Sequence, residues 1–315
     1  MSRSLKALAA ALLVSALAIT GCSSDDSTGS TTTTAPVGTF DSGHADYDAI
    51  INAGAVATAA TIDANEWAKA VKAAGVLKVG GTTTGLFSLE DPATGIAYGF
   101  DAGLSQLLSR YILGDAKAEI TQVTSSTRES VLETNAVDVV FATYSILPSR
   151  LERINFAGPY YASQSSILVL KTNTEITGVA DLAGKKVAVQ AGSAAVALLE
   201  TEAPAAEIVA LPDDAQCVTA VVQGRVDAYV VDSALLLRTV TDNQDVKMVG
   251  EPFGPVDAYG IGVNKENDGK AFIDLWLQQI IDDGTWLNLW KATVQATTGT
   301  EVLPATPVIN SAGNA

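Results

Sequence analysis

Hydrophobic positions follow two different periods along this chain, and the pattern occurs twice. In the first half, short apolar runs indicate buried strands, and they alternate with segments of helical period. The predicted elements are a helix over Asp63–Ala74 with Asp63 or Asn65 near its start, a strand over Val76–Val79, a helix over Phe100–Leu113, a strand over Ala118–Val123, a helix over Thr127–Asn135 and a strand over Val137–Ala142. This order favours a parallel sheet with helices on both faces.

The alternation then restarts. The predicted elements are strands over Ser166–Leu170, Lys186–Gln190, Glu207–Leu211 and Asp227–Val231, a helical turn over Ala180–Leu182, and helices over Ser193–Glu202, Asp214–Gln223 and Ser233–Asp242. A late strand over Gly260–Val263 and an amphipathic helix over Ala271–Asp283 could belong to either unit. Two α/β lobes joined by two chain crossings form a hinge, and a ligand commonly binds between such lobes.

The N-terminus has the pattern of an export signal. Arg3 and Lys6 precede a short apolar run, Ala7–Ile19, which is too short to span a bilayer comfortably. The run ends in Ile19-Thr20-Gly21-Cys22, which resembles the lipobox of bacterial lipoproteins, with an ordinary secretory signal as the alternative. We therefore expect residues 1–21 to be a signal peptide, a lipid on Cys22, and a flexible tether over residues 22–45.

Composition excludes several function classes. The 315 residues carry a formal net charge of -16, which disfavours nucleic acid as a partner. The one histidine, His44, falls in or just after the predicted tether, so triad catalysis and His-based zinc sites lack their residues in the folded region. Catalysis by carboxylates alone remains open. Cys217 is expected to be a small buried hydrophobic residue rather than a reactive thiol.

Candidate chemistry lies after the strand Val137–Ala142. Ser145 and Arg150 leave the end of this strand five residues apart. A hydroxyl and a guanidinium can hold a carboxylate together, because Arg offers two parallel donors. The alternative is a surface arginine in an ion pair with Glu152 or another acid.

An ordered series of motifs extends this interpretation. The motifs are Leu77-Lys78-Val79-Gly80, Tyr98-Gly99-Phe100-Asp101, Ala142–Arg150, Phe156-Ala157-Gly158-Pro159-Tyr160-Tyr161, Asp181–Val187, Gly224-Arg225-Val226-Asp227-Ala228, Tyr259–Val263 and Asp283-Gly284-Thr285-Trp286. From about Val76 to Trp290 the chain resembles the bacterial extracellular solute-binding proteins of family 3, the polar amino-acid receptors of ABC importers. Within that family it looks most like the actinobacterial glutamate/glutamine-binding lipoproteins.

The resemblance implies a type II periplasmic-binding-protein fold with a two-crossing hinge. Lobe 1 is then residues 46–168 and 253–298, lobe 2 is residues 169–252, and residues 299–315 form a loose tail. The resemblance implies neither a cofactor nor catalytic residues. It implies a monomer that binds an amino acid and docks on an ABC permease.

The resemblance also assigns ligand contacts. Ser145 and Arg150, with Thr143 in the same loop, match the positions that bind an α-carboxylate. Backbone N–H groups at Ser193 and Ala194 would offer a second anion contact, and Asp232 matches the carboxylate that pairs with the ligand ammonium. The alternative for both Ser193 and Asp232 is a helix N-cap.

Three further positions have weaker assignments. Arg128 stands where receptors for acidic amino acids carry an arginine; its alternative is a solvated side chain paired with Glu129 or Glu133. Gln190 stands where some relatives have lysine. Phe87 or Tyr144 would supply an apolar wall, and each is otherwise ordinary packing.

Departures from the family pattern concern the disulfide and the ligand. Ala188 replaces a cysteine that many relatives pair with the position of Cys217, so that staple is absent. A Thr-rich loop, Thr82-Thr83-Thr84, replaces an acidic residue that helps to hold the ammonium.

The sequence therefore predicts a lipid-anchored extracytoplasmic receptor for glutamate or aspartate first, or for glutamine or asparagine. The alternatives are a sensor subunit that signals to a membrane partner and a cyclohexadienyl-dehydratase-like enzyme on the same fold.

Overall fold

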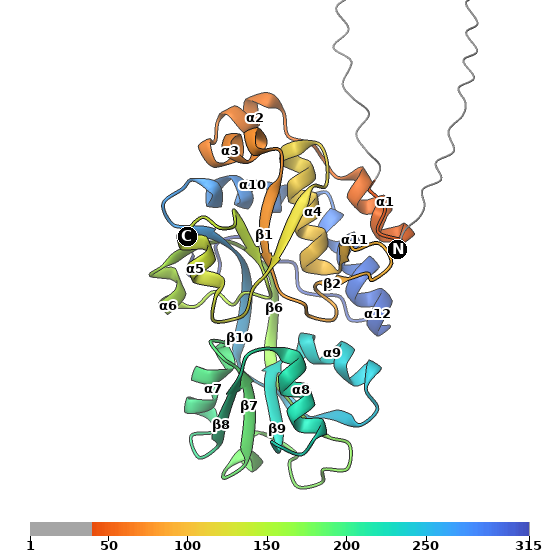
Figure 1. Cartoon of the computed structure of the whole chain (residues 1–315), viewed down its shortest axis with the longest axis vertical. Coiled ribbons are helices and arrows are strands. Elements are labelled where there is room, and N and C mark those ends of the chain that lie inside the picture. The colour runs from red at the N-terminus through yellow and green to blue at the C-terminus, as the bar shows by residue number, and fades with distance from the viewer. Residues whose placement is uncertain (1–39, 315) are drawn as a thin grey trace, which may run out of the picture. The chain divides into compact units, whose positions relative to one another are not determined.

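Two long antiparallel strands organise the fold, β6 (Ile154–Leu170) and β10 (Val246–Asn264). In the computed structural model, which describes residues 40–314, both strands run through the two groups of elements seen in Figure 1. Their pairing shifts register between Val249 and Phe253, between Phe253 and Asp257, and between Tyr259 and Ile261. These irregularities bend the ribbon where it passes between the lobes.

One strand order includes both lobes: β4-β1-β5-β10-β6-β9-β7-β8. In lobe 1, β1 (Leu77–Gly81) pairs in parallel with β4 (Ala118–Gln122) and β5 (Val139–Phe141). In lobe 2, β7 (Lys186–Gln190) pairs in parallel with β8 (Glu207–Leu211) and β9 (Ala228–Asp232). The chain is therefore an α/β protein of two lobes joined by two crossings, which confirms the predicted fold class.

The remaining elements cover these strands. In lobe 1 they are α1 (Ala45–Ala53), α2 (Ala59–Asp63), α3 (Glu66–Ala74), β2 (Leu89–Glu90), β3 (Ala97–Tyr98), α4 (Phe100–Leu113), α5 (Arg128–Glu133), α6 (Pro148–Leu151), α10 (Gly269–Asp282), α11 (Thr285–Trp290), η2 (Lys291–Gln295) and α12 (Ala296–Thr298). In lobe 2 they are η1 (Val179–Leu182), α7 (Ala194–Glu202), α8 (Asp214–Val222) and α9 (Ser233–Asp242).

The crossing points follow from the strand partners. Residues Ser165–Leu168 of β6 pair with β9, whereas Ile154–Ala157 of β6 pair with the end of β10 that also contacts β5. The chain thus passes from lobe 1 to lobe 2 near Ser163–Ser165, a few residues before the predicted boundary at 168.

Several predicted elements need correction. Of the two starts predicted for the helix that ends at Ala74, the structure has the one at Asn65, which caps α3 by accepting the Ala68 N–H at 2.9 Å; Asp63 is instead the last residue of α2. The two hinge strands are much longer than predicted. The four elements Phe100–Leu113, Lys186–Gln190, Glu207–Leu211 and Ser233–Asp242 match their predicted bounds.

The described part of the predicted tether is already held by the lobe. The backbone of Phe40 exchanges two hydrogen bonds with the Asn52 side chain, and Ser42 donates to Asp48. His44 stacks on Tyr98, with ring centroids 3.9 Å apart, so it belongs to the folded region and not to the tether. The signal peptide, Cys22 and most of the tether lie outside the described residues.

The C-terminal segment was expected to be loose, yet its end packs against β6. Asn314 is 3% exposed and its amide donates to the carbonyls of Phe156 and Gly158, both at 3.0 Å. The Asn310 N–H also donates to Gly158 at 2.8 Å. Polar composition alone did not reveal these partners.

Candidate ligand-binding site

Seven of the predicted site residues meet around one small cavity. It is lined from lobe 1 by Ser125, Arg128, Thr143 and Ser145, and from lobe 2 by Gln190, Ser193, Ala194, Ala195, Val231, Asp232 and Leu235. The residues lie at or after the ends of β4, β5, β7 and β9, because the carboxyl ends of parallel strands converge at one edge. Its volume is about 20 Å³, room for about one water molecule. An amino acid can therefore enter only when the lobes separate.

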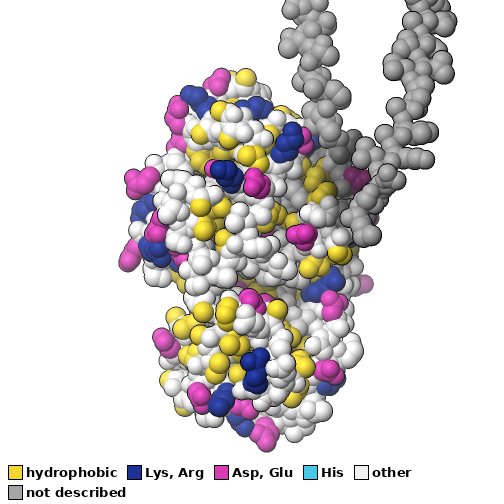
Figure 2. Space-filling model, in the orientation of Figure 1, with side chains coloured by type: hydrophobic (Ala, Val, Ile, Leu, Met, Phe, Trp, Pro, Cys, Tyr) yellow, Lys and Arg dark blue, Asp and Glu magenta, His cyan; other side chains and the backbone are white. Residues whose placement is uncertain are grey.

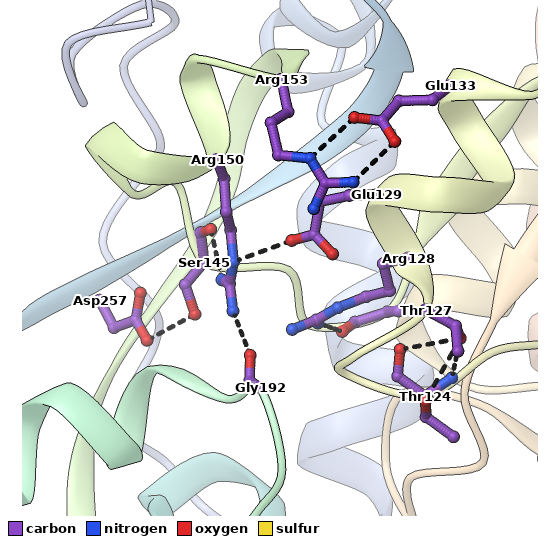
Figure 3. A network of polar contacts seen from close by, with 11 residues as sticks. Thr124, Thr127, Arg128, Glu129, Glu133, Ser145, Arg150, Arg153, Gly192 and Asp257 are labelled. Atoms are coloured by element: carbon purple, nitrogen blue, oxygen red, sulfur yellow. Dashed lines mark hydrogen bonds and ion pairs between the residues drawn. The ribbon is translucent and has the colours of Figure 1, made fainter.

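Arg150 bridges the lobes from α6. Its Nη1 donates to the Ser145 carbonyl at 2.8 Å and its Nη2 donates to the Gly192 carbonyl of lobe 2 at 2.9 Å. Its Nε lies 3.3 Å from Glu129 Oε1 (Figure 3). Arg150 is only 6% exposed. Arg150 does form an ion pair, as the alternative predicted, but its partner is Glu129 and the side chain is buried rather than at the surface.

Arg128 is buried next to Arg150. It is 4% exposed, its Nη1 donates to the Ala142 carbonyl at 2.8 Å, and its Nε is buried without a partner. The guanidinium carbons of Arg128 and Arg150 lie 4.1 and 5.1 Å from the centroid of the Tyr144 ring. Burial, and then the nearby Arg150, lower the pKa of Arg128 to about 10. The alternative of a solvated Arg128 is wrong, since Glu129 pairs with Arg150 and Glu133 pairs with Arg153.

Two carboxylates face this cationic pair. Ser145 Oγ donates to Asp257 Oδ2 at 2.8 Å, and Tyr259 OH donates to Asp232 Oδ2 at 2.6 Å. Burial, and then the charge of Asp257, raise the pKa of Asp232 to about 7; burial also raises the pKa of Asp257. Asp257 was not identified as a site residue from the sequence, because it lies in a bent part of the hinge strand β10 that matches no motif.

The cap alternatives for Ser193 and Asp232 are not seen. Neither side chain makes an N-cap hydrogen bond to its helix. Ser193 Oγ is buried without a partner and lines the cavity. These two polar groups are therefore not used in holding α7 or α9.

The loop that carries Thr143 is fixed from below by a carboxylate of α4. Thr143 has a left-handed φ of 44°, and its N–H donates to Asp101 Oδ2 at 2.8 Å. Tyr160 OH donates to the other oxygen of Asp101 at 2.8 Å. Asp101 was quoted from the sequence only as part of a motif, and its supporting role follows from these contacts.

Gln190 links the lobes from β7. Ser125 Oγ donates to Gln190 Oε1 at 3.1 Å, and Gln190 Nε2 donates to Tyr229 OH at 2.9 Å. Tyr229 OH in turn donates to Asp214 Oδ1 at 2.9 Å. Ser125 and Gln190 also line a larger neighbouring cavity of about 420 Å³, whose other walls are Thr82–Gly85, Gln122–Thr124 and Pro212–Ala215.

Phe87 and Cys217 lie apart from the small cavity. Phe87 is fully buried and packs against Phe100, Tyr161 and Tyr259, with ring centroids 5.3 to 6.3 Å apart. Phe87 therefore has its alternative role, ordinary core packing, and does not form a wall of the small cavity. Cys217 is a free, buried thiol whose pKa is raised to about 12, first by burial, so it behaves as a small core residue.

The described residues contain neither a group of metal ligands nor a helix that could span a membrane. Across residues 40–314, no three His, Cys, Asp or Glu side chains gather as metal ligands would. Within the same residues, none of the helices combines the length and apolar character needed to cross a bilayer. On the face in Figure 2, basic side chains are interspersed with acidic ones, so that face carries no continuous basic surface.

Two α/β lobes, a two-strand hinge and a polar cavity at the strand ends define a two-lobe solute-binding protein. The chain matches the bacterial extracellular solute-binding proteins, family 3, over residues 77–292, and it belongs to that family. The predicted family resemblance is thereby confirmed.

Similar proteins bind different amino acids. The glutamine-binding protein GlnH of an ABC transporter from Bacillus subtilis (strain 168) is 31% identical over 217 residues, which cover 68% of this chain and 79% of GlnH. The glutamate-binding protein GluB of Corynebacterium efficiens is 28% identical over 201 residues, covering 60% and 68%. A crystal structure of the cysteine-binding protein from Campylobacter jejuni has a TM-score of 0.72 at 26% identity and covers 78% of this chain and 98% of that one.

Proposed function

We propose that this chain is a lipid-anchored extracytoplasmic receptor that binds a polar amino acid between its lobes and delivers it to an ABC permease. The ligand class is glutamate and aspartate, or glutamine and asparagine. One observation carries the proposal: Arg128 and Ser145 from lobe 1 meet Ser193 and Asp232 from lobe 2 around one cavity, and the buried Arg150 beside Arg128 donates to the Gly192 carbonyl of lobe 2. Two relatives support it: one is named as the glutamine-binding protein of an ABC transporter, and the other as a glutamate-binding protein.

The α-carboxylate would bind to lobe 1. Arg150 and Ser145 supply charged and neutral donors, and the contacts they now make to Gly192 and Asp257 would be exchanged for the two ligand oxygens. The N-terminus of α7, with the unpartnered Ser193 Oγ, adds donors from lobe 2. Asp232 would pair with the ammonium group.

Binding would stabilise the closed form. The carboxylate is held mainly by lobe 1 and the ammonium by lobe 2, so the ligand gains its full set of contacts only when both lobes meet. A ligand shifts a conformational equilibrium by its difference in affinity for the two states. The closed form would then be the one that the permease recognises.

The first experiment is titration calorimetry on the chain without its signal peptide and tether. A thermal-shift screen of the common amino acids should first identify one or two stabilising ligands. Arg150→Ala should then lose binding by at least about 100-fold, because a buried carboxylate loses a charged partner. Arg153→Ala is the matched control, since Arg153 is half exposed and pairs with Glu133 away from the cavity. Unchanged affinity in Arg150→Ala would contradict the proposal that Arg150 binds the ligand carboxylate.

The lipid anchor is tested separately, because Cys22 lies outside the described residues. Cys22→Ala should move the protein from the membrane fraction to the medium and abolish labelling by a fatty-acid analogue. A variant that stays membrane-bound and labelled would contradict the anchor and leave the binding site untouched.

One of the similar solved structures bears on the enzyme alternative. An ancestral amino acid-binding protein described as a precursor of cyclohexadienyl dehydratase has a TM-score of 0.65 at 28% identity, covering 72% of this chain and 99% of that one. That protein is itself named as a binding protein, which favours binding here too. Turnover of prephenate or arogenate by this chain would reverse the preference.

A further inference from the structure

The cationic charge of Arg150 is already compensated within lobe 1. Its guanidinium lies 3.3 Å from Glu129 Oε1, and the two side chains are 7% and 10% exposed. Figure 3 shows Glu129 reaching from α5 to Arg150, while Glu133, one turn further on, pairs with Arg153. Arg150 and Glu129 together thus bring no net charge to the site, although Arg150 keeps its hydrogen-bond donors.

The remaining charges at the cavity do not favour a second ligand carboxylate. Arg128 is the one lining cation, and Asp232 lines the same cavity with Asp257 close to Ser145. A neutral zwitterion adds one positive and one negative group, which Asp232 and Arg128 can balance. Glutamate adds a further negative charge without another uncompensated cation, and unpaired charge in a buried site is strongly unfavourable.

The neighbouring cavity, which offers room for the ligand side chain, also disfavours a carboxylate. The neighbouring cavity shares Ser125 and Gln190 with the small one, and its lobe 2 wall includes Asp213 and Asp214. The threonines Thr82–Thr84 and Gln122 supply hydroxyl and amide groups on the lobe 1 wall. An amide can donate to the acidic wall and accept from the hydroxyls, whereas a carboxylate is repelled by the former.

We propose that this receptor selects amino acids with an uncharged amide side chain over those with a side-chain carboxylate, and that Glu129 sets this preference by neutralising Arg150. The inference rests on the proposed function and narrows its ligand class to glutamine and asparagine. Glu129 is a specificity-determining residue that acts through Arg150 and does not itself line the cavity.

The test compares two isosteric substitutions on one helix. Glu129→Gln frees the charge of Arg150, while Glu133→Gln makes the same charge change away from the cavity. Affinities for glutamine and glutamate are measured by calorimetry on both variants and on the unsubstituted chain. We expect the unsubstituted chain to prefer glutamine by at least about ten-fold, and Glu129→Gln to shift that ratio towards glutamate by about ten-fold or more. Glu133→Gln should leave the ratio within about two-fold.

The outcomes separate the two proposals. Tighter binding of glutamate than of glutamine by the unsubstituted chain overturns the inference and leaves the receptor assignment standing, and this measurement needs no variant to fold. An unchanged ratio in a folded Glu129→Gln variant overturns the role of Glu129. Failure of every amino acid to bind the unsubstituted chain removes both proposals.

Discussion

Asp101 is a buried carboxyl group that holds the floor of the site. Its oxygens accept from the Thr143 N–H and from Tyr160 OH, and it is 1% exposed. Burial raises the pKa of Asp101 to about 7, although these hydrogen bonds and Arg128 act in the opposite direction. The folded chain therefore binds a proton at Asp101 that the unfolded chain releases above pH of about 4.

Asp101→Asn should change how stability depends on pH. The native state of the unsubstituted chain keeps the proton between pH of about 4 and 7, so the contribution of Asp101 is fully present below about 4 and is lost as pH rises through about 7. Asparagine cannot ionise. Relative to the unsubstituted chain, the variant should gain on the order of 1–4 kcal/mol between pH 4 and pH 8, measured by urea unfolding at each pH. Parallel stability curves for the two proteins would contradict the raised pKa.

At the residue scale, the sequence predicted which side chains gather at the candidate site better than it predicted their hydrogen-bond and ion-pair partners. Residues such as Ser145, Arg150 and Asp232 follow strand ends, and strand ends were readable from the apolar runs. The ion-pair partner of Arg150 could not be predicted from the sequence. Glu152 is near in sequence, whereas Glu129 is brought close only by the packing of α5 beside α6. Asp257 was missed for the same reason.

Elements with one clear period were predicted well, and the hinge strands were not. β6 contains Gly158-Pro159 and β10 contains Gly254-Pro255, and such pairs normally end a strand in a sequence pattern. The two strands continue through these residues because they pair with each other, with shifts in register at the bends. Long-range pairing of this kind leaves no local signal.

Asn314→Ala tests whether the C-terminal segment stabilises lobe 1. The substitution removes two hydrogen bonds to the carbonyls of Phe156 and Gly158 and leaves buried backbone groups with fewer partners. The free energy of unfolding should fall by about 1–3 kcal/mol. Val302→Ala is a suitable control, since Val302 is 78% exposed in the same segment, and it should change stability by less than about 0.5 kcal/mol. Equal stability of both variants would mean that the tail contributes nothing to lobe 1.

Direct polar contacts between the lobes identify the described conformation as closed. Two of them, Arg150 Nη2 to the Gly192 carbonyl and Ser125 Oγ to Gln190 Oε1, reach lobe 2 at one place. Both partners in lobe 2 lie at the end of β7 or in the turn that follows it. This turn therefore meets lobe 1 only on closure, and a side chain added there should oppose closure.

Gly192→Ala tests whether the turn after β7 approaches lobe 1 on closure. Gly192 has a φ of +76°, and a Cβ there would lie 3.0 Å from Ser126 Cα and 3.1 Å from Ser125 O across the lobe interface. The preferred amino acid should bind about five- to ten-fold more weakly, because the added methyl group strains the closed state and not the open one.

The matched control is Gly184→Ala in the same lobe. Gly184 has a φ of +72°, and a Cβ there would meet no atom within 4 Å. Both variants therefore introduce the same kind of left-handed backbone strain, about 1 kcal/mol in overall stability. Only Gly192→Ala should weaken binding in calorimetry and enlarge the ligand-bound radius of gyration in small-angle scattering. Equal affinities in the two variants would mean that the turn after β7 does not approach lobe 1 when the ligand binds.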